Sequence, residues 1–134
     1  MNYTNNQSIF IQIAERISDR ILDGSYKANE RIPSVRELAV EMQVNPNTVM
    51  RSFERLQTHE IIYNKRGIGY FVSSGADEKI RRMRHNVFVE EVLPALFKEM
   101  QLLDVGLDEL TAAYTLYIGS AGKQAAPAGS AATP

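Results

Sequence analysis

A polar stripe between residues 45 and 58 carries side chains that hydrogen-bond well to nucleic acid. Asparagine, threonine, serine and arginine recur at spacings of three and four, which place them on one helix face. The stripe consists of Asn47, Thr48, Arg51, Ser52 and Arg55. Such side chains bind base edges and phosphates, and the forked guanidinium of Arg51 matches a guanine. We expect this face to point outward and to contain no Asp or Glu; the alternative is an ordinary solvated face.

The stretch around Ser34 predicts a second group that attracts phosphate. Ser34 and Glu37 have the spacing of a capping box, so a helix should begin directly after Ser34. The free N–H groups and positive dipole of a helix N-terminus attract anions, and Arg36 adds a full charge there. The alternative is that Ser34 only caps the helix while Arg36 pairs with Glu37 or Glu41.

A predicted hairpin supplies a third group. Two runs rich in β-branched and aromatic residues, 61–65 and 68–72, flank a short turn. Lys65 and Arg66 stand at its tip, and Gly67 allows the backbone to approach a phosphate closely. The alternative is that the charged tip serves only solubility.

Three helices must position these groups. Isoleucines at every fourth residue from Ile9 to Ile21 predict an amphipathic helix that ends before Gly24. The capping box predicts a second helix from Val35 to Met42. Asn45, followed by a proline, predicts the start of a third helix that reaches about Thr58. Two helices joined by a short turn form a helix-turn-helix, and the following hairpin makes this a winged helix.

A seam of apolar residues follows in the C-terminal part. It steps by four, three, four and three, as in a helix that packs on another helix, through Val89, Leu93, Leu96, Met100 and Leu103. Pro94 interrupts this seam and predicts a kink or break near residues 92–94. Gly106 should end the segment, and residues 107–118 are predicted as a last short helix.

The predicted fold class is mainly α with a small β-hairpin. We expect a winged helix-turn-helix over residues 8–74 and a short helical dimerisation region over 76–118. Residues 119–134 are rich in Ala, Gly, Ser and Pro, which predicts a flexible tail.

Length and composition exclude several classes of protein. The 134 residues suit one domain with a small appendage and leave no room for a two-domain enzyme. Without cysteine there is no disulfide, thiol nucleophile or zinc-thiolate site, and the first residues do not resemble a signal peptide, so we expect a cytoplasmic protein. No apolar run approaches the roughly 20 residues that span a membrane. The net charge of −1 requires any DNA binding to depend on a focused patch.

Catalysis is not predicted, and we expect neither a cofactor nor a metal. His59 and His85 are far apart in the sequence and offer no ligand cluster. Glu90 and Glu91 are adjacent, so on a helix they point about 100° apart and do not form an acid/base pair.

Three runs of residues resemble a known family. They are Arg31–Ala39 (RIPSVRELA), Val44–Arg51 (VNPNTVMR) and Arg66–Val72 (RGIGYFV). In this order and spacing they resemble the DNA-binding domain of the GntR family of bacterial transcription regulators. The resemblance implies a homodimer on a palindromic operator, with the third helix in the major groove and the hairpin, or wing, at the adjacent minor groove. It assigns DNA contacts to Ser34, Arg36, Asn45, Asn47, Thr48, Arg51, Lys65, Arg66 and Gly67.

The short C-terminal part resembles the YtrA-like subfamily, in which two helices serve dimerisation. That resemblance implies repression, often of genes for ABC-type transporters. Packing of the seam back onto the chain's own winged helix is the alternative to a dimer.

The rival function is a winged helix that binds another protein without binding an operator. Phe88, Phe97 and Tyr114 could line an effector pocket between the C-terminal helices; the alternative is that they form the apolar core of the dimer interface. The sequence identifies no effector.

Overall fold

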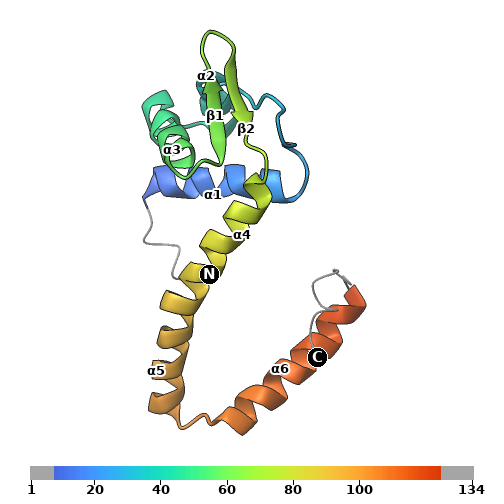
Figure 1. Ribbon diagram of the computed structural model, residues 1–134. Helices are drawn as coiled ribbons and strands as arrows, with labels where there is room; N and C mark the ends of the chain where they lie inside the picture. Colours follow the sequence, from blue (N-terminus) through green and yellow to red (C-terminus); the bar gives the residue numbers. More distant parts are fainter. Residues whose placement is uncertain (1–7, 125–134) are drawn as a thin grey trace. The chain divides into compact units, whose positions relative to one another are not determined.

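The computed structural model describes residues 8–124, which form two compact units that divide between Asn86 and Val87. The first unit contains three helices at the predicted positions: α1 (Ile9–Leu22), α2 (Val35–Met42) and α3 (Pro46–Thr58). α1 packs against α3, and α3 lies beside the hairpin (Figure 1). This arrangement confirms the predicted winged helix, mainly α with a small β-hairpin.

A single apolar core holds the first unit together. α3 contributes Val49 and Phe53, both fully buried, and the rings of Phe53 and Tyr70 of the hairpin meet edge to face at a centroid distance of 4.8 Å. From α1 the core takes Ile13, Ile17 and Ile21. Ile9, the first member of the predicted isoleucine series, is instead 53% exposed, because it lies at the first residue of the helix, beyond the core.

The hairpin consists of β1 (Ile62–Lys65) and β2 (Gly69–Val72), which pair in antiparallel register with Ile62 opposite Val72. The segment before α2 extends this pairing, which the sequence did not predict. The Ile32 N–H donates to the Tyr70 carbonyl at 2.9 Å, and Arg31 forms an isolated bridge with Phe71. The wing and the start of α2 are therefore tied to each other through backbone hydrogen bonds.

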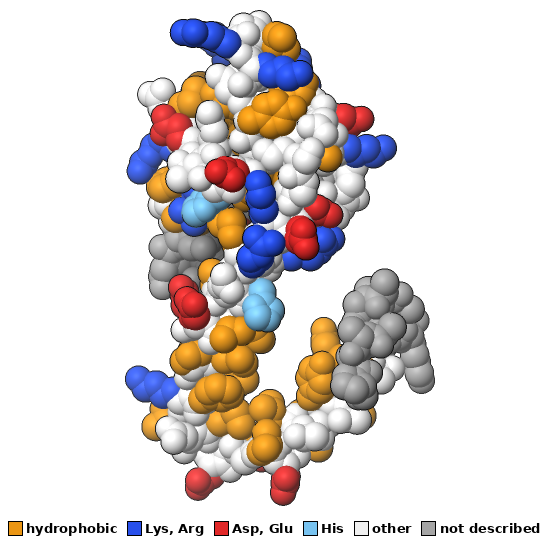
Figure 2. Space-filling model, viewed as in Figure 1, with side chains coloured by type: hydrophobic (Ala, Val, Ile, Leu, Met, Phe, Trp, Pro, Cys, Tyr) orange, Lys and Arg blue, Asp and Glu red, His pale blue; other side chains and the backbone are white. Residues whose placement is uncertain are grey.

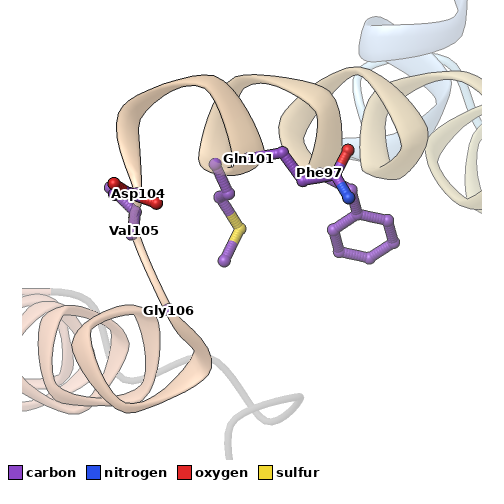
Figure 3. Close-up of a pocket in the computed structure, with 6 residues that line it drawn as sticks. Phe97, Gln101, Asp104, Val105 and Gly106 are labelled. Carbon is purple, nitrogen blue, oxygen red and sulfur yellow. The ribbon is translucent and has the colours of Figure 1, made fainter.

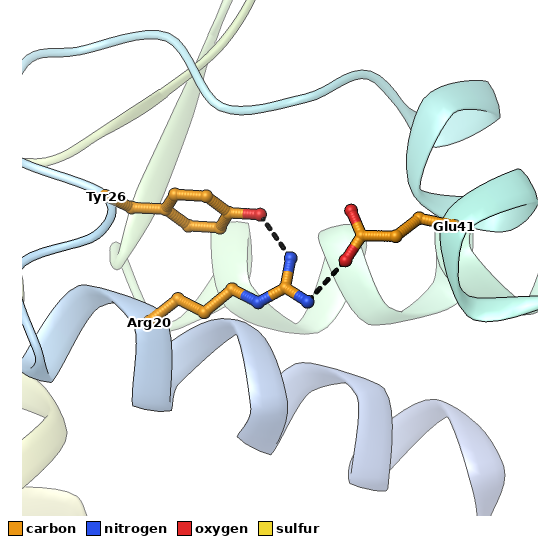
Figure 4. A network of polar contacts seen from close by, with 3 residues as sticks. All are labelled: Arg20, Tyr26 and Glu41. Carbon is orange, nitrogen blue, oxygen red and sulfur yellow. Dashed lines mark hydrogen bonds and ion pairs between the residues drawn. The ribbon is translucent and has the colours of Figure 1, made fainter.

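A polar network ties α2 to α1 (Figure 4). The guanidinium of Arg20 on α1 donates to the Tyr26 hydroxyl at 2.7 Å and forms an ion pair with Glu41 on α2. The hydrogen bond from Arg20 lowers the pKa of the Glu41 carboxyl, and the same contact raises the pKa of Arg20. Glu41 therefore pairs with Arg20 and is not the partner of Arg36.

Helix α4 (Ala76–Val87) joins the first unit, which corrects the predicted domain boundary at residues 74–76. Ala76 and Ile80 are each 2% exposed in the winged-helix core. Arg84 pairs with Glu15 at 2.7 Å and with Asp19 on the same helix, α1, at 2.9 Å. The charged stretch at 77–84 hid these contacts in the sequence, because charged residues separate the two buried apolar residues, Ala76 and Ile80.

The second unit contains a π-helical turn, η2 (Phe88–Val92), followed by α5 (Leu93–Leu103) and α6 (Leu107–Gln124). The predicted distortion near Pro94 takes the form of this π turn and not of a break. Proline has no N–H for the carbonyl four residues earlier, and a widened turn accommodates that loss. None of the described helices is long and apolar enough to cross a membrane.

α6 extends six residues beyond its predicted end at Ile118, so the predicted start of a tail at residue 119 was wrong. Once a helix has formed, each added residue gains a hydrogen bond without a new nucleation cost, so a glycine such as Gly119 does not end it. The remainder of the predicted tail, residues 125–134, lies outside the described residues.

Candidate nucleic-acid interface

The outer face of α3 carries most of the predicted polar stripe. Asn47 and Arg51 are exposed, whereas Thr48 and Arg55 are half-buried. Ser52 is fully buried, which corrects the prediction that it points outward. Its position is three residues after Val49 and four before Leu56, and it shares their buried side of the helix.

Ser52 has a structural role instead. Its hydroxyl donates to the carbonyl of Phe10 on α1 at 2.6 Å, with the Thr48 carbonyl at 3.2 Å as the longer alternative. A buried hydroxyl without such a partner is costly, so this bond favours one docking of α1 against α3.

Arg51 stacks on the ring of Phe10. The guanidinium carbon lies 4.2 Å from the ring centroid, within the range of a cation–π contact. Phe10 was not among the site residues that the sequence predicted. No spacing in the sequence connects residue 10 with residue 51, because only the docking of the two helices brings them together.

An acidic residue interrupts this face, contrary to the prediction. Glu54 is exposed and lines a shallow hollow of about 310 Å³ together with Phe10, Arg51 and Arg55. It is three residues after Arg51, so the helical spacing itself gives it a place on the stripe. Across residues 8–124, no ion pair connects Glu54 with either arginine.

The two asparagines at the start of α3 have different tasks. The side-chain carbonyl of Asn45 accepts the backbone N–H of Asn47 at 2.7 Å, which confirms Asn45 as the N-cap. The amide NH₂ of Asn45 keeps its donors for another partner. The side chain of Asn47 is exposed on the first turn of the helix.

The N-terminus of α2 has the predicted capping box. The Ser34 hydroxyl accepts the Glu37 N–H at 3.1 Å, and the Glu37 carboxylate accepts the Ser34 N–H at 2.8 Å. The latter hydrogen bond lowers the pKa of the Glu37 carboxyl. Because this carboxylate already occupies part of the positive end of the helix, Arg36 is the main attraction for a phosphate there. Arg36 is exposed and forms no ion pair with any described residue.

The tip of the wing is basic and exposed (Figure 2). The ammonium of Lys65 lies 4.6 Å from the centroid of the Phe71 ring, which directs the side chain along the outer face of the hairpin. Arg66 and Gly67 form the turn, and the positive φ of Gly67, +77°, explains the need for glycine.

Arg31 lies close to this tip, although the sequence did not single it out as a site residue. Its Nε donates to the carbonyl of Ile68, in the turn of the wing, at 3.2 Å. Gly69 permits this approach, because a Cβ there would lie 2.6 Å from Arg31 Nε. The signal in the sequence was Gly69, the second glycine of the hairpin, because a glycine in a strand marks a close approach but not the residue that approaches.

Charge is distributed unequally between the two units. Residues 1–86 carry 13 Lys and Arg against 10 Asp and Glu, a balance of +3, whereas residues 87–134 carry 2 against 6, a balance of −4. The near-neutral total therefore conceals a basic winged helix.

The second unit has a hollow of about 580 Å³ at the turn between α5 and α6 (Figure 3). Its lining includes Phe97, Met100 and Gln101 of α5 with Val105 and Gly106 of the turn. Of the three residues predicted near an effector pocket, Phe97 contributes to this lining, whereas Phe88 and Tyr114 do not.

Comparison with known proteins identifies the family. The protein-family model described as "Bacterial regulatory proteins, gntR family" matches residues 11–72 of the sequence. Over 108 residues the chain is 30% identical to YhcF of Bacillus subtilis (strain 168), described as an uncharacterized HTH-type transcriptional regulator; the match covers 81% of this chain and 88% of YhcF. The chain belongs to the GntR family. As a GntR protein it is a DNA-binding transcriptional regulator and not an enzyme.

The similarity to GntR proteins extends beyond the winged helix. The chain is 31% identical over 102 residues to YtrA of Bacillus subtilis (strain 168), described as an HTH-type transcriptional repressor, with coverage of 76% of this chain and 78% of YtrA. The chain is 47% identical in sequence to a putative GntR regulator from Bacteroides thetaiotaomicron whose crystal structure is known. The two structures match with a TM-score of 0.76, over 84% of this chain and 98% of the other. Matches of 108 and 102 residues are longer than the winged helix, so they extend into the C-terminal part of the chain and confirm the YtrA-like resemblance.

We predict that Gly69→Ala destabilises the winged helix by about 1–3 kcal/mol. The backbone at residue 69 has φ +146°, which only glycine adopts readily, and the new Cβ would displace Arg31. Urea unfolding followed by circular dichroism measures this change. Gly67→Ala is the control: its φ is +77° and nothing lies within 4 Å of the added carbon, so it has backbone strain without displacement. A smaller loss of stability for Gly69→Ala than for Gly67→Ala would contradict the assigned contact.

Proposed function

We propose that this GntR protein binds a palindromic operator as a homodimer and represses transcription in the cytoplasm. The observation that carries the proposal is the exposed polar face of α3, where Arg51 is not paired with an acid in the described part of the chain. An α-helix fits the major groove, whose base edges accept such donors. The basic wing then reaches the adjacent minor groove.

The predicted site residues divide by the chemistry of their side chains. Asn47, Thr48 and Arg51, on the first turns of α3, are proposed to contact base edges. The remaining members are proposed to contact the sugar-phosphate backbone: Ser34, Arg36, Asn45, Arg55, Lys65, Arg66 and Gly67. The exposure of Arg36, Lys65 and Arg66 supports this division.

The exposed apolar surface of the second unit supports the homodimer. Twelve of the sixteen exposed large hydrophobic side chains in the described residues lie between Val87 and Ile118. The predicted seam forms part of this surface. Val89 is 44% exposed, Leu96 37% and Leu103 67%, whereas Leu93 and Met100 are half-buried. Monomeric proteins rarely expose so continuous an apolar surface. A second copy presents the same seam and would also cover the hollow beside Met100.

Repression is proposed because YtrA, which resembles the chain over most of its length, is described as a repressor. The proposed cytoplasmic location rests on a DNA partner in a bacterial family, not on any targeting signal. A small-molecule effector remains a separate proposal for which the hollow at Phe97 is the place to search.

We predict that Arg51→Ala weakens operator binding by about 1–3 kcal/mol and relaxes base preference, whereas Lys65→Ala weakens binding to all sequences alike. The reason is that Arg51 is proposed to read a base and Lys65 to contact phosphate. Gel-shift titrations on a palindromic site from the protein's own promoter, repeated at several salt concentrations, measure both effects. Loss of one phosphate contact lowers the slope of log affinity against log salt by about one.

Equal affinity of both variants and the wild-type protein for every sequence would contradict DNA recognition by this surface. Binding that does not change with salt would favour the rival function, association with another protein.

We predict that Leu96→Glu converts a dimer, of twice the 15.1 kDa chain mass, into a monomer. Burial of a charge in the seam would be costly, and loss of the second half-site would weaken operator binding by about a hundredfold or more. Sedimentation velocity measures the oligomeric state. Lys98→Gln is the matched control, because it makes the same change in charge at an exposed position of α5 outside the seam. A monomeric wild-type protein would support the alternative that the seam packs within one chain.

A further inference from the structure

We propose that Phe10, in the first turn of α1, is a positioning residue that holds Arg51 ready for base recognition. This inference rests on the proposed operator binding and adds to it a residue outside the helix-turn-helix. Phe10 is not expected to touch DNA bases; it acts through the side chain of Arg51.

The contact with Phe10 leaves hydrogen-bonding groups of Arg51 available. The guanidinium carbon of Arg51 lies over the Phe10 ring, 4.2 Å from the ring centroid. A guanidinium has five N–H donors and a phenyl ring has no oxygen or nitrogen acceptor, so this contact is not an ion pair and leaves donors for another partner. An ion pair with Glu54 would occupy these donors, but no such pair is present within residues 8–124.

The ring is anchored to the same helix that carries Arg51. The Phe10 carbonyl accepts the hydroxyl of Ser52 at 2.6 Å, and Ser52 directly follows Arg51 on α3. Ser52 is fully buried, so no water competes for this bond. The Ser52 side chain thus fixes the backbone of Phe10 relative to α3, which keeps the ring of Phe10 beside the guanidinium of Arg51.

The physical effect of the ring is to restrict a long and otherwise mobile side chain. An exposed arginine loses rotamer freedom when it binds, and a side chain already held in place loses less. An exposed cation–π contact has a strength that corresponds to about a two- to fivefold change in affinity. This change should appear only at the base pair that Arg51 reads.

The experiment begins with a consensus palindrome, selected by the wild-type protein from a randomised duplex library. Fluorescence anisotropy then measures affinity for the consensus and for each single base-pair substitution at constant salt. Arg51→Ala identifies the base pair that Arg51 reads, as the position where preference disappears. Phe10→Leu and Phe10→Met remove the ring, Phe10→Tyr keeps it, and Ile9→Leu is the control at the neighbouring exposed position. Thermal unfolding shows which variants are folded.

We expect Phe10→Leu and Phe10→Met to reduce preference about two- to fivefold at the base pair read by Arg51 and nowhere else. The salt dependence of binding should not change, because no phosphate contact is lost. Phe10→Tyr should retain the wild-type preference, and Phe10→Leu should cause no further loss in the Arg51→Ala background.

In the folded variants that lack the ring, Phe10→Leu and Phe10→Met, an unchanged preference, a tighter preference or a uniform loss at all base pairs would each overturn the inference. A tighter preference would mean that the ring sequesters Arg51. An Arg51→Ala variant with unaltered preferences would also overturn it. If the wild-type protein selects no sequence from the library, the proposed operator binding itself has failed, which is a separate and recognisable outcome.

Discussion

The docking of α3 on α1 is the constraint on which the rest of the winged helix depends. Val49 and Phe53 are fully buried, and the Ser52 hydroxyl bonds the backbone of α1. These contacts set the rotation of α3 about its own axis. Successive residues of a helix are about 100° apart, so a rotation by one residue would bury Arg51 and expose the core. The exposed polar face is therefore a consequence of what the other face buries.

Around this pair of helices, other contacts fix the remaining basic groups. The backbone of residues 29–32 pairs with β2, so the segment that leads into α2 and the wing share hydrogen bonds. Arg20 holds α2 to α1 through Glu41. The elements that carry the basic groups, α2, α3 and the wing, thus share one core, whereas the acidic second unit exposes the apolar side chains on which the proposed homodimer rests.

Local signals made much of this fold predictable. The capping box at Ser34, the Asn45–Pro46 start of α3 and the glycine turn at Gly67 each determine backbone within a few residues of themselves. Contacts between distant segments left no such signal. The burial of Ser52, the stacking of Phe10 on Arg51 and the packing of α4 on α1 arise from tertiary docking. The exposed position of Glu54 was available from helical spacing and was missed.

The central claim, that the outer face of α3 reads bases in the major groove, is tested most directly with modified operators. Replacement of a contacted guanine by 7-deazaguanine removes the N7 acceptor from the major groove and keeps base pairing. The account predicts at least about a fivefold loss of affinity for the wild-type protein and no loss for Arg51→Ala. Inosine in place of the same guanine removes only the minor-groove amino group. Wild-type binding that tolerates 7-deazaguanine at every position but is sensitive to inosine would contradict the account.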